Sequence, residues 1–386
     1  MHYILYIVLS VLPSFLFTLT ALPVQQRSKL QELLLTTCFV INLSIPFFYA
    51  GQYSYACNMG TGVWCWAFGM KMGVWLTMPM EERRKRRFCW TLFYWRLRPQ
   101  PIKPTKEWQS IPVRPYLMAY LKRQLIFDFL YRLFQWIDTH QSVHVFEKGL
   151  ANVLGAMYEP RIHHDAAITT GAVLMSFLLC TAFSIYLQLQ LQLTYDTIIL
   201  ICAIVYQVLP SLGSHGWIRS VKYYIEDVLT MPPLFHSPWH ATSLRDFWSN
   251  RWHKIYNDCF YRLGYRPMRK FCRNRWVPAL SVFILSGIMH EYFLYCTSGN
   301  WRASGFQFLF FVLQTVGVVV GDAIPSRTLG AVWAIAFMVL TSHLFVVPYL
   351  VTGYTYMSQF RLVASVWYII EKGHGMLKNA AYQLGA

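Results

Sequence analysis

The sequence predicts an all-α, polytopic helical membrane protein with about 8–9 transmembrane helices and further helices at the membrane interface. Hydrophobic residues occupy 55% of its 386 positions and charged residues only 13%, which is too few to solvate a soluble protein of this size. The apolar residues are gathered in long runs, which is typical of membrane-spanning helices. The formal net charge of +17 is concentrated between these runs, as in loops that face anionic headgroups. We therefore expect membrane lipids, and no nucleic acid, as partners of the basic residues.

The apolar runs give the candidate spans, and several are shorter than the roughly 20 residues that a perpendicular helix needs. Some could therefore be re-entrant or broken. A separate stretch, residues 116–137, mixes apolar and charged side chains, which favours a helix lying in the interface. The candidate spans are residues 3–22, 33–50, 61–78, 166–187, 197–212, 277–296, 305–320, 329–350 and 354–370.

Charge predicts the orientation of these spans. Segments 81–106 and 245–275 are strongly basic and belong on the cytoplasmic side by the positive-inside rule. Two candidate spans lie between them and would return the chain to the same side. The first run has no Lys or Arg before it, which favours a retained span over a cleaved signal peptide. We expect a lumenal N-terminus and a cytosolic C-terminus.

We expect one integral membrane domain over residues 1–386. Within it, residues 1–80 form N-terminal spans, residues 81–165 a basic cytosolic or interfacial segment, and residues 166–386 a core that holds the two motifs described next. None of the nine cysteines forms a Cys-x-x-Cys pair, and no histidine pair shows zinc-ligand spacing with a third ligand. We therefore expect neither a disulfide framework nor a metal site.

His290 lies in the stretch Ser286–Phe293, toward the end of an apolar run. An ionisable side chain at membrane depth is costly, which makes it a functional candidate. Imidazole can also give and take a proton near neutral pH. The alternative is a histidine that is only hydrogen-bonded inside a helix bundle.

A second motif, Phe247–His253, lies in the basic segment before that run and reads Phe-Trp-Ser-Asn-Arg-Trp-His. If it is helical, Asn250 and His253 share one face. Its aromatic residues would then anchor the segment at the interface while a polar group points inward. The alternative is an interfacial anchor helix whose histidine contacts lipid headgroups.

Together, the two motifs resemble those of the membrane-bound O-acyltransferase superfamily, and most closely its wax-synthase-like branch. That branch pairs Phe-Trp-x-x-Arg-Trp-His with a later Ser-Gly-x-x-His-Glu, matched here by Phe247–His253 and Ser286–Glu291. The resemblance covers roughly residues 232–296 by its motifs and the remainder by hydrophobic pattern alone. Ser249-Asn250 departs from the Gly-Arg of many relatives, which bears on local loop geometry. In length and loop style the chain is also similar to fungal O-acetyltransferases of secondary metabolism.

This resemblance implies a superfamily-like helical fold in the endoplasmic reticulum and acyl transfer from acyl-CoA to a hydroxyl, with His290 as general base. It further implies acetyl-CoA as co-substrate, a lipophilic terpenoid or meroterpenoid alcohol as acceptor, and no permanently bound cofactor. The chemistry agrees, because an alcohol is a weak nucleophile that needs a base, and such catalysis contributes roughly 10²–10⁴-fold. One alternative is a long-chain wax ester or sterol O-acyltransferase. Another is a transporter or lipid-binding protein that uses His290 as a proton relay, although we find no inverted repeat.

The remaining site residues follow from the same reasoning. His253 could donate a hydrogen bond to the thioester oxygen, and Asn250 is a weaker candidate for that role. For Gly287 we expect a helix-packing role, and for Glu291 an arginine or helix partner. CoA carries several phosphates, so we expect it to bind the cytosolic basic segment. The candidates are Arg245, Arg251, Lys254 and Trp252.

Overall fold

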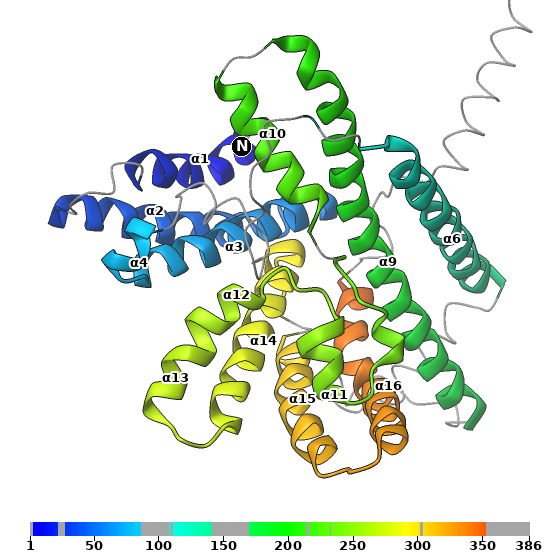
Figure 1. The fold of residues 1–386 in the computed structure, drawn as a ribbon. Coiled ribbons are helices and arrows are strands. Elements are labelled where there is room, and N and C mark those ends of the chain that lie inside the picture. Colours follow the sequence, from blue (N-terminus) through cyan, green and yellow to red (C-terminus); the bar gives the residue numbers. More distant parts are fainter. Residues whose placement is uncertain are drawn as a thin grey trace, which may run out of the picture. The chain divides into compact units, whose positions relative to one another are not determined.

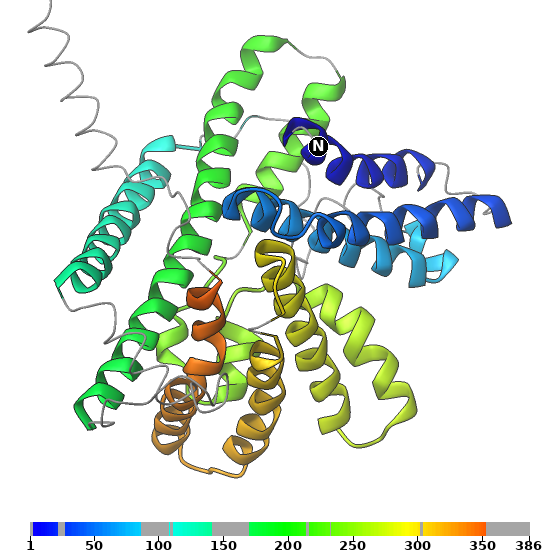
Figure 2. The ribbon, with the colours of Figure 1, turned by 180° about the vertical axis from the view of Figure 1, so that it is seen from behind.

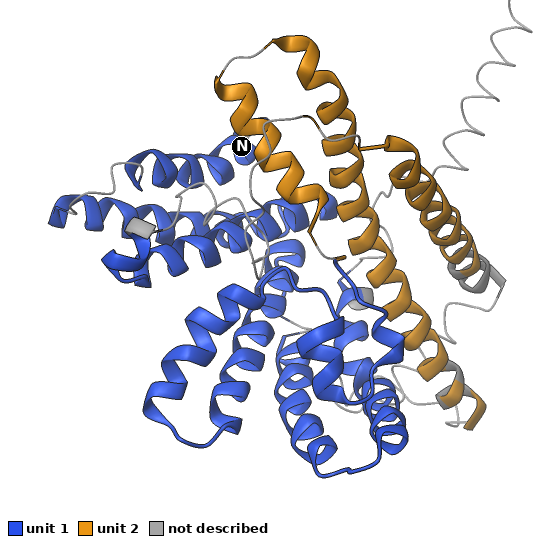
Figure 3. Cartoon of the chain, in the orientation of Figure 1, with its two compact units in different colours: residues 1–99, 234–357 blue, residues 100–233, 358–386 orange. Residues whose placement is uncertain are grey.

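A computed structural model describes residues 3–21, 28–85, 108, 111–140, 170–213, 216–231, 233–301 and 304–352 (Figure 1). Within these ranges all regular structure is helical, which confirms the predicted all-α class. The helices form two compact units (Figure 3). Unit 1 comprises Met1–Pro99 and Leu234–Met357, and unit 2 comprises Gln100–Pro233 and Ser358–Ala386. Both motifs lie in unit 1, which joins the expected N-terminal spans to the second half of the expected core.

In the described part of the chain, five helices are long and apolar enough to cross a membrane. The polytopic membrane class is thus confirmed, although the predicted number of spans is not reached within the described residues. Helix α15 (Phe306–Asp322) is apolar but shorter, and the expected span 354–370 lies outside the described residues. The five helices are α1 (Tyr3–Ala21), α2 (Lys29–Phe48), α9 (Thr170–Val208), α14 (Trp276–Ser298) and α16 (Arg327–Val351).

One prediction about the spans is wrong: the described parts of the runs 166–187 and 197–212 are not two spans, because the single helix α9 runs unbroken from Thr170 to Val208. The residues between the runs contain neither Gly nor Pro, so nothing there ends a helix. Asp196 in this stretch accepts hydrogen bonds from Gln192, at 2.6 Å, and from Arg123 on α6 (Val113–His140), at 2.5 Å. The two-span argument for placing both basic segments on one side is therefore lost, and the orientation stays a prediction.

Unit 2 is organised by α6 and α10 (Gly216–Leu229), which both pack against α9 (Figure 2). The expected interfacial stretch 116–137 is indeed helical and forms most of α6. A buried ion pair on α10 joins Lys222 to Glu226 at 2.9 Å, and the Tyr206 hydroxyl of α9 donates to the same carboxylate at 2.6 Å. These charges are neutralised inside the unit, as buried charges must be.

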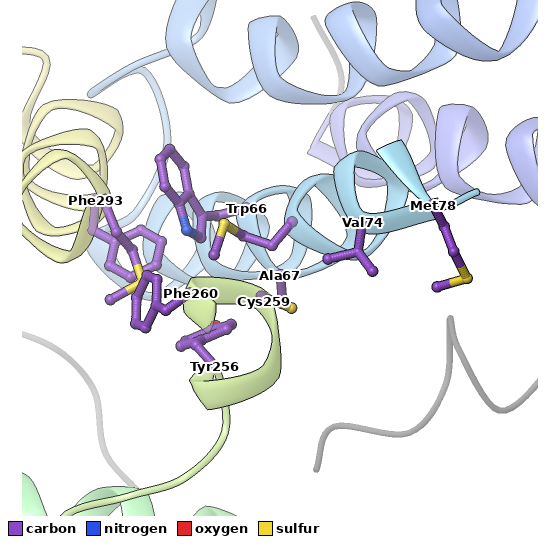
Figure 4. Packing of buried hydrophobic residues seen from close by; sticks show 10 residues of the cluster. Trp66, Ala67, Val74, Met78, Tyr256, Cys259, Phe260 and Phe293 are labelled. Carbon is purple, nitrogen blue, oxygen red and sulfur yellow. The ribbon is translucent and has the colours of Figure 1, made fainter. Parts of the chain in front are cut away.

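In unit 1, α3 (Tyr55–Thr77) packs against both α14 and the segment that follows the first motif. That segment comprises α12 (Asn257–Phe260) and the π-helical turn η5 (Tyr261–Tyr265). Figure 4 shows the buried side chains of this contact, with Tyr256, Cys259 and Phe260 facing α3. The packing fixes the chain that leads from the first motif to the His290 helix. The cluster comprises Trp66, Ala67, Met70, Val74, Met78, Tyr256, Cys259, Phe260, Met289 and Phe293.

Helices α14 and α15 approach closely at Gly287. A Cβ atom at this position would lie 2.8 Å from Cδ2 and 3.0 Å from Cα of Phe308, distances that real contacts avoid. Gly287 is therefore a packing position, as expected, because only its bare backbone lets the helices come this near.

We predict that Gly287→Ala destabilises the protein by about 1–3 kcal/mol, because the added methyl group overpacks the contact with Phe308. Thermal unfolding in detergent measures the effect. The matched control is Gly60→Ala on α3, where a Cβ atom meets nothing within 4 Å. The control should unfold at or slightly above the wild-type temperature. Equal stability of Gly287→Ala and Gly60→Ala would contradict the tight α14–α15 contact.

Candidate active site

The His290 side chain lies where α14, α15 and α16 meet. Its ring stacks on Phe311 of α15, with centroids 4.8 Å apart, and lies edge-on to Phe345 of α16 at 5.2 Å. Its Nδ1 atom is 3.2 Å from the hydroxyl oxygen of Tyr349. Within the described residues Nε2 has no partner. Tyr349 thus holds the imidazole at its Nδ1 edge, and Phe311 and Phe345 pack against the ring. The other nitrogen, Nε2, stays available.

Two further polar side chains belong to these helices: Glu291, next to His290 on α14, and Gln307, near the start of α15. Glu291 Oε1 accepts the backbone N–H of Phe308, the third residue of α15, at 2.9 Å. It therefore caps a helix N-terminus, where a negative charge is favourable; this is the helix partner that the sequence led us to expect. Gln307 is fully buried and donates to the Phe345 carbonyl at 2.7 Å. Glu291 Oε2 and Gln307 Oε1 are buried and accept no hydrogen bond from the described residues.

The first motif is not the regular helix that we considered. Helix α11 (Leu244–Asp246) begins at Ser243, whose hydroxyl accepts the Asp246 N–H at 3.0 Å. It widens into the π-helical turn η4 (Phe247–Arg251), which the Trp252 N–H closes on the Phe247 carbonyl at 2.8 Å. The helix ends before His253, so the expected face shared by Asn250 and His253 does not form. Single π-turns are frequent at functional sites.

Trp248 connects this motif to the His290 helix bundle. Its indole Nε1 donates to Gln314 of α15 at 3.2 Å. Its ring lies 6.0 Å from that of Phe311, which in turn stacks on His290. Trp252 stacks on the buried Phe247 at 5.3 Å and belongs to the same aromatic cluster. The motif thus packs into the bundle through its aromatic side chains.

His253 lies next to the rings of Trp252 and Phe235, at centroid distances of 5.6 and 6.0 Å. Its Nδ1 atom is buried and has no hydrogen-bond partner in the described part of the chain. Burial lowers the pKa of His253 to about 4, so the ring stays neutral at physiological pH. A series of ring contacts connects His253 to His290: Trp252 contacts His253 and Trp248, and Phe311 contacts Trp248 and stacks on His290.

The other predicted residues occupy a surface network around two aspartates. Asn250 is exposed and donates to Asp246 at 3.0 Å, and Arg251 donates to the same carboxylate at 2.5 Å. Burial alone would raise the pKa of Asp246, but these hydrogen bonds and one from the Thr242 backbone N–H lower it. Arg245 is bidentate to Asp322, with Nε 2.9 Å from Oδ1. In the structure these side chains are therefore engaged by aspartates.

Lys254 differs from both arginines. Its side chain is exposed and has no partner within the described ranges. It directly follows His253 in the chain. Sequence reasoning ranked the three cations together because their acidic partners could not be identified.

Tyr349 is the site residue that sequence reasoning missed. It stands at the end of the apolar run 329–350, where an aromatic residue is ordinary for a membrane interface. Its contact with His290 spans 59 positions of the chain. No local pattern could have signalled it.

Comparison with known proteins gives several similar acyltransferases. The chain is 33% identical over 138 residues to the long-chain-alcohol O-fatty-acyltransferase of Simmondsia chinensis, covering 32% of this chain and 39% of that protein. It is 22% identical over 340 residues to the probable long-chain-alcohol O-fatty-acyltransferase 2 of Arabidopsis thaliana, covering 82% and 80%. It is also 29% identical over 111 residues to the Arabidopsis thaliana acyl-CoA–sterol O-acyltransferase 1, covering 27% and 32%.

The alignment with the Simmondsia chinensis protein is partial, because the chain spans about two fifths of the length of that protein. A family match covers the part of the chain that holds both motifs. Residues 231–313, which contain η4, His253 and His290, match the model of the Membrane bound O-acyl transferase family.

Proposed function

We propose that this protein is a membrane-embedded O-acyltransferase that transfers an acyl group from acyl-CoA to the hydroxyl of a lipophilic alcohol. The observation that carries the proposal is the His290 imidazole, held by Tyr349 and Phe311 with one nitrogen free and connected to His253 through the rings of Trp248 and Trp252. The match of residues 231–313 to the Membrane bound O-acyl transferase family supports it. A transporter that uses His290 as a proton relay would not need the second, neutral imidazole.

His290 Nε2 takes the proton of the alcohol as its oxygen attacks the thioester carbonyl carbon. Negative charge then develops on the carbonyl oxygen, and we assign the hydrogen bond to this oxygen to the neutral His253. When the tetrahedral intermediate collapses, the carbon–sulfur bond breaks and the CoA thiolate leaves with the proton held by His290. The products are the ester and free CoA, so the reaction needs no covalent enzyme intermediate.

The relatives favour a long acyl chain over acetyl. Two of the relatives described above are named for fatty-acyl transfer to long-chain alcohols, and one for acyl transfer to sterols. We therefore propose a fatty acyl-CoA donor and a long-chain or sterol-like acceptor in the membrane. Acetyl transfer to a terpenoid, the first expectation from the sequence, stays a prediction. A purified-protein assay with acetyl-, octanoyl- and palmitoyl-CoA and a panel of alcohols separates these cases.

We predict that His290→Ala and His290→Gln both lose acyl transfer by roughly 10²–10⁴-fold, the usual contribution of a general base. Glutamine preserves most of the volume and can still contact Tyr349, but its amide accepts no proton. Ester formation is measured together with monodispersity in detergent. Activity above about a tenth of wild type in well-folded His290→Gln would remove His290 from the base role.

We predict that His253→Ala lowers kcat strongly and changes KM for acyl-CoA little, because its hydrogen bond forms with the transition state. Since the His253 pKa is about 4, burial keeps it neutral and the wild-type rate should show no His253 titration between about pH 5 and pH 8. His240→Ala, at an exposed histidine of the same unit, is the control. An unchanged kcat in His253→Ala would return this residue to a packing role.

We predict that Lys254→Glu raises KM for acyl-CoA by about 10-fold, through the loss of roughly 1.4 kcal/mol of charge-assisted hydrogen bonding to a phosphate. Lys270→Glu on α13 (Arg266–Phe271) is exposed and makes the same change in net charge, so it is the control. Arg251→Glu instead breaks the pair with Asp246 and should lower stability. Equal effects of Lys254→Glu and Lys270→Glu would show that only overall charge attracts the donor.

A further inference from the structure

The contact between Tyr349 and His290 bears on which nitrogen of the base meets the substrate. Tyr349 occupies the Nδ1 edge of the ring at 3.2 Å. The ring itself cannot turn freely, because Phe311 stacks on its face and Phe345 lies against it. The nitrogen left for the alcohol is therefore Nε2.

Proton transfer strengthens this contact. For Nε2 to take a proton from the alcohol, the neutral ring must carry its hydrogen on Nδ1, so Nδ1 donates to the Tyr349 oxygen before and after the transfer. The Tyr349 O–H therefore turns to another acceptor, and the Nδ1 hydrogen bond becomes charge-assisted once the ring is protonated. The contact is thus strongest when His290 is charged, which is the state that forms during the reaction.

Two candidate acceptors for the Tyr349 proton come from the elements around His290. Glu291 directly follows His290 on α14, and Gln307 of α15 donates to the Phe345 carbonyl, one turn before Tyr349 on α16. Each of the two side chains has one buried oxygen that receives no hydrogen bond from the described residues, Glu291 Oε2 and Gln307 Oε1. Buried acceptors of this kind are uncommon in folded proteins. Glu291 adds a negative charge that stabilises a cation at His290.

We infer that Tyr349 is a positioning residue that fixes the His290 ring with Nε2 toward the substrate, and that Glu291 stabilises the protonated ring through Tyr349. The inference rests on the proposed function and deepens it. It assigns to the end of α16 a role in acyl transfer, and it gives Glu291 a second role besides capping α15. Tyr349 itself does not touch the substrate.

The test is a kinetic comparison of Tyr349→Phe, Glu291→Gln and the double variant, with palmitoyl-CoA and a long-chain alcohol. Tyr349→Phe should lower kcat by about 10–100-fold, a part of the general-base effect, and leave both KM values within about 2-fold. Glu291→Gln retains an oxygen for the Phe308 N–H, so α15 keeps its cap, and it should also lower kcat. The double variant should be no slower than Tyr349→Phe, because Glu291 acts through the hydroxyl that is already absent.

The matched control is Tyr292→Phe, which removes a hydroxyl from α14 that donates to the Leu43 carbonyl at 2.8 Å. Its kcat should stay near wild type, so an equal loss there would assign the Tyr349 effect to packing. Wild-type kcat in Tyr349→Phe, or independent effects that multiply in the double variant, would overturn the inference. If Tyr349→Phe is not monodisperse, Glu291→Gln serves as the test on its own, and a wild-type kcat in that variant overturns the inference. Activity in His290→Ala would instead overturn the proposed function.

Discussion

The close approach of α14 and α15 at Gly287 is the constraint on which the site depends. Because Gly287 has no side chain, Phe308 lies against its backbone. Phe311, one turn later on α15, then stacks on His290, and the N-terminus of α15 meets Glu291. The small residue Gly287 thus allows two contacts: Phe311 stacks on the His290 ring, and the Phe308 N–H donates to Glu291.

The aromatic residues of the first motif pack against the same helix, α15. Trp248 reaches α15 through Gln314 and Phe311, so the segment before His253 is anchored to the helix that also holds the His290 ring. The π-helical turn η4 ends at Arg251, so His253 lies beyond the helix. Two motifs that are separate in sequence become one arrangement because both pack on α15.

The sequence predicted the fold class, the helices α14, α15 and α16 nearly to their ends, and the packing role of Gly287, because hydrophobic runs and small residues are local signals. It could not predict Tyr349, nor the pairing of Arg245 with Asp322 across 77 positions, because such contacts depend on tertiary packing. It also divided α9 in two, since the Leu and Gln alternation at its centre lowers hydropathy without ending a helix. The helix face that Asn250 and His253 were expected to share does not form, because the π-helical turn η4 ends at Arg251, and the catalytic role of Asn250 stays a prediction.

We propose that this membrane site joins two substrates and does not move or store one. The decisive experiment measures the ester formed and the CoA thiol released by the purified protein in liposomes that contain a long-chain alcohol. We expect equal amounts of ester and free CoA, with thiol release that depends on the alcohol. Alcohol binding or transbilayer movement without ester, or thiol release that is independent of the alcohol, would contradict it.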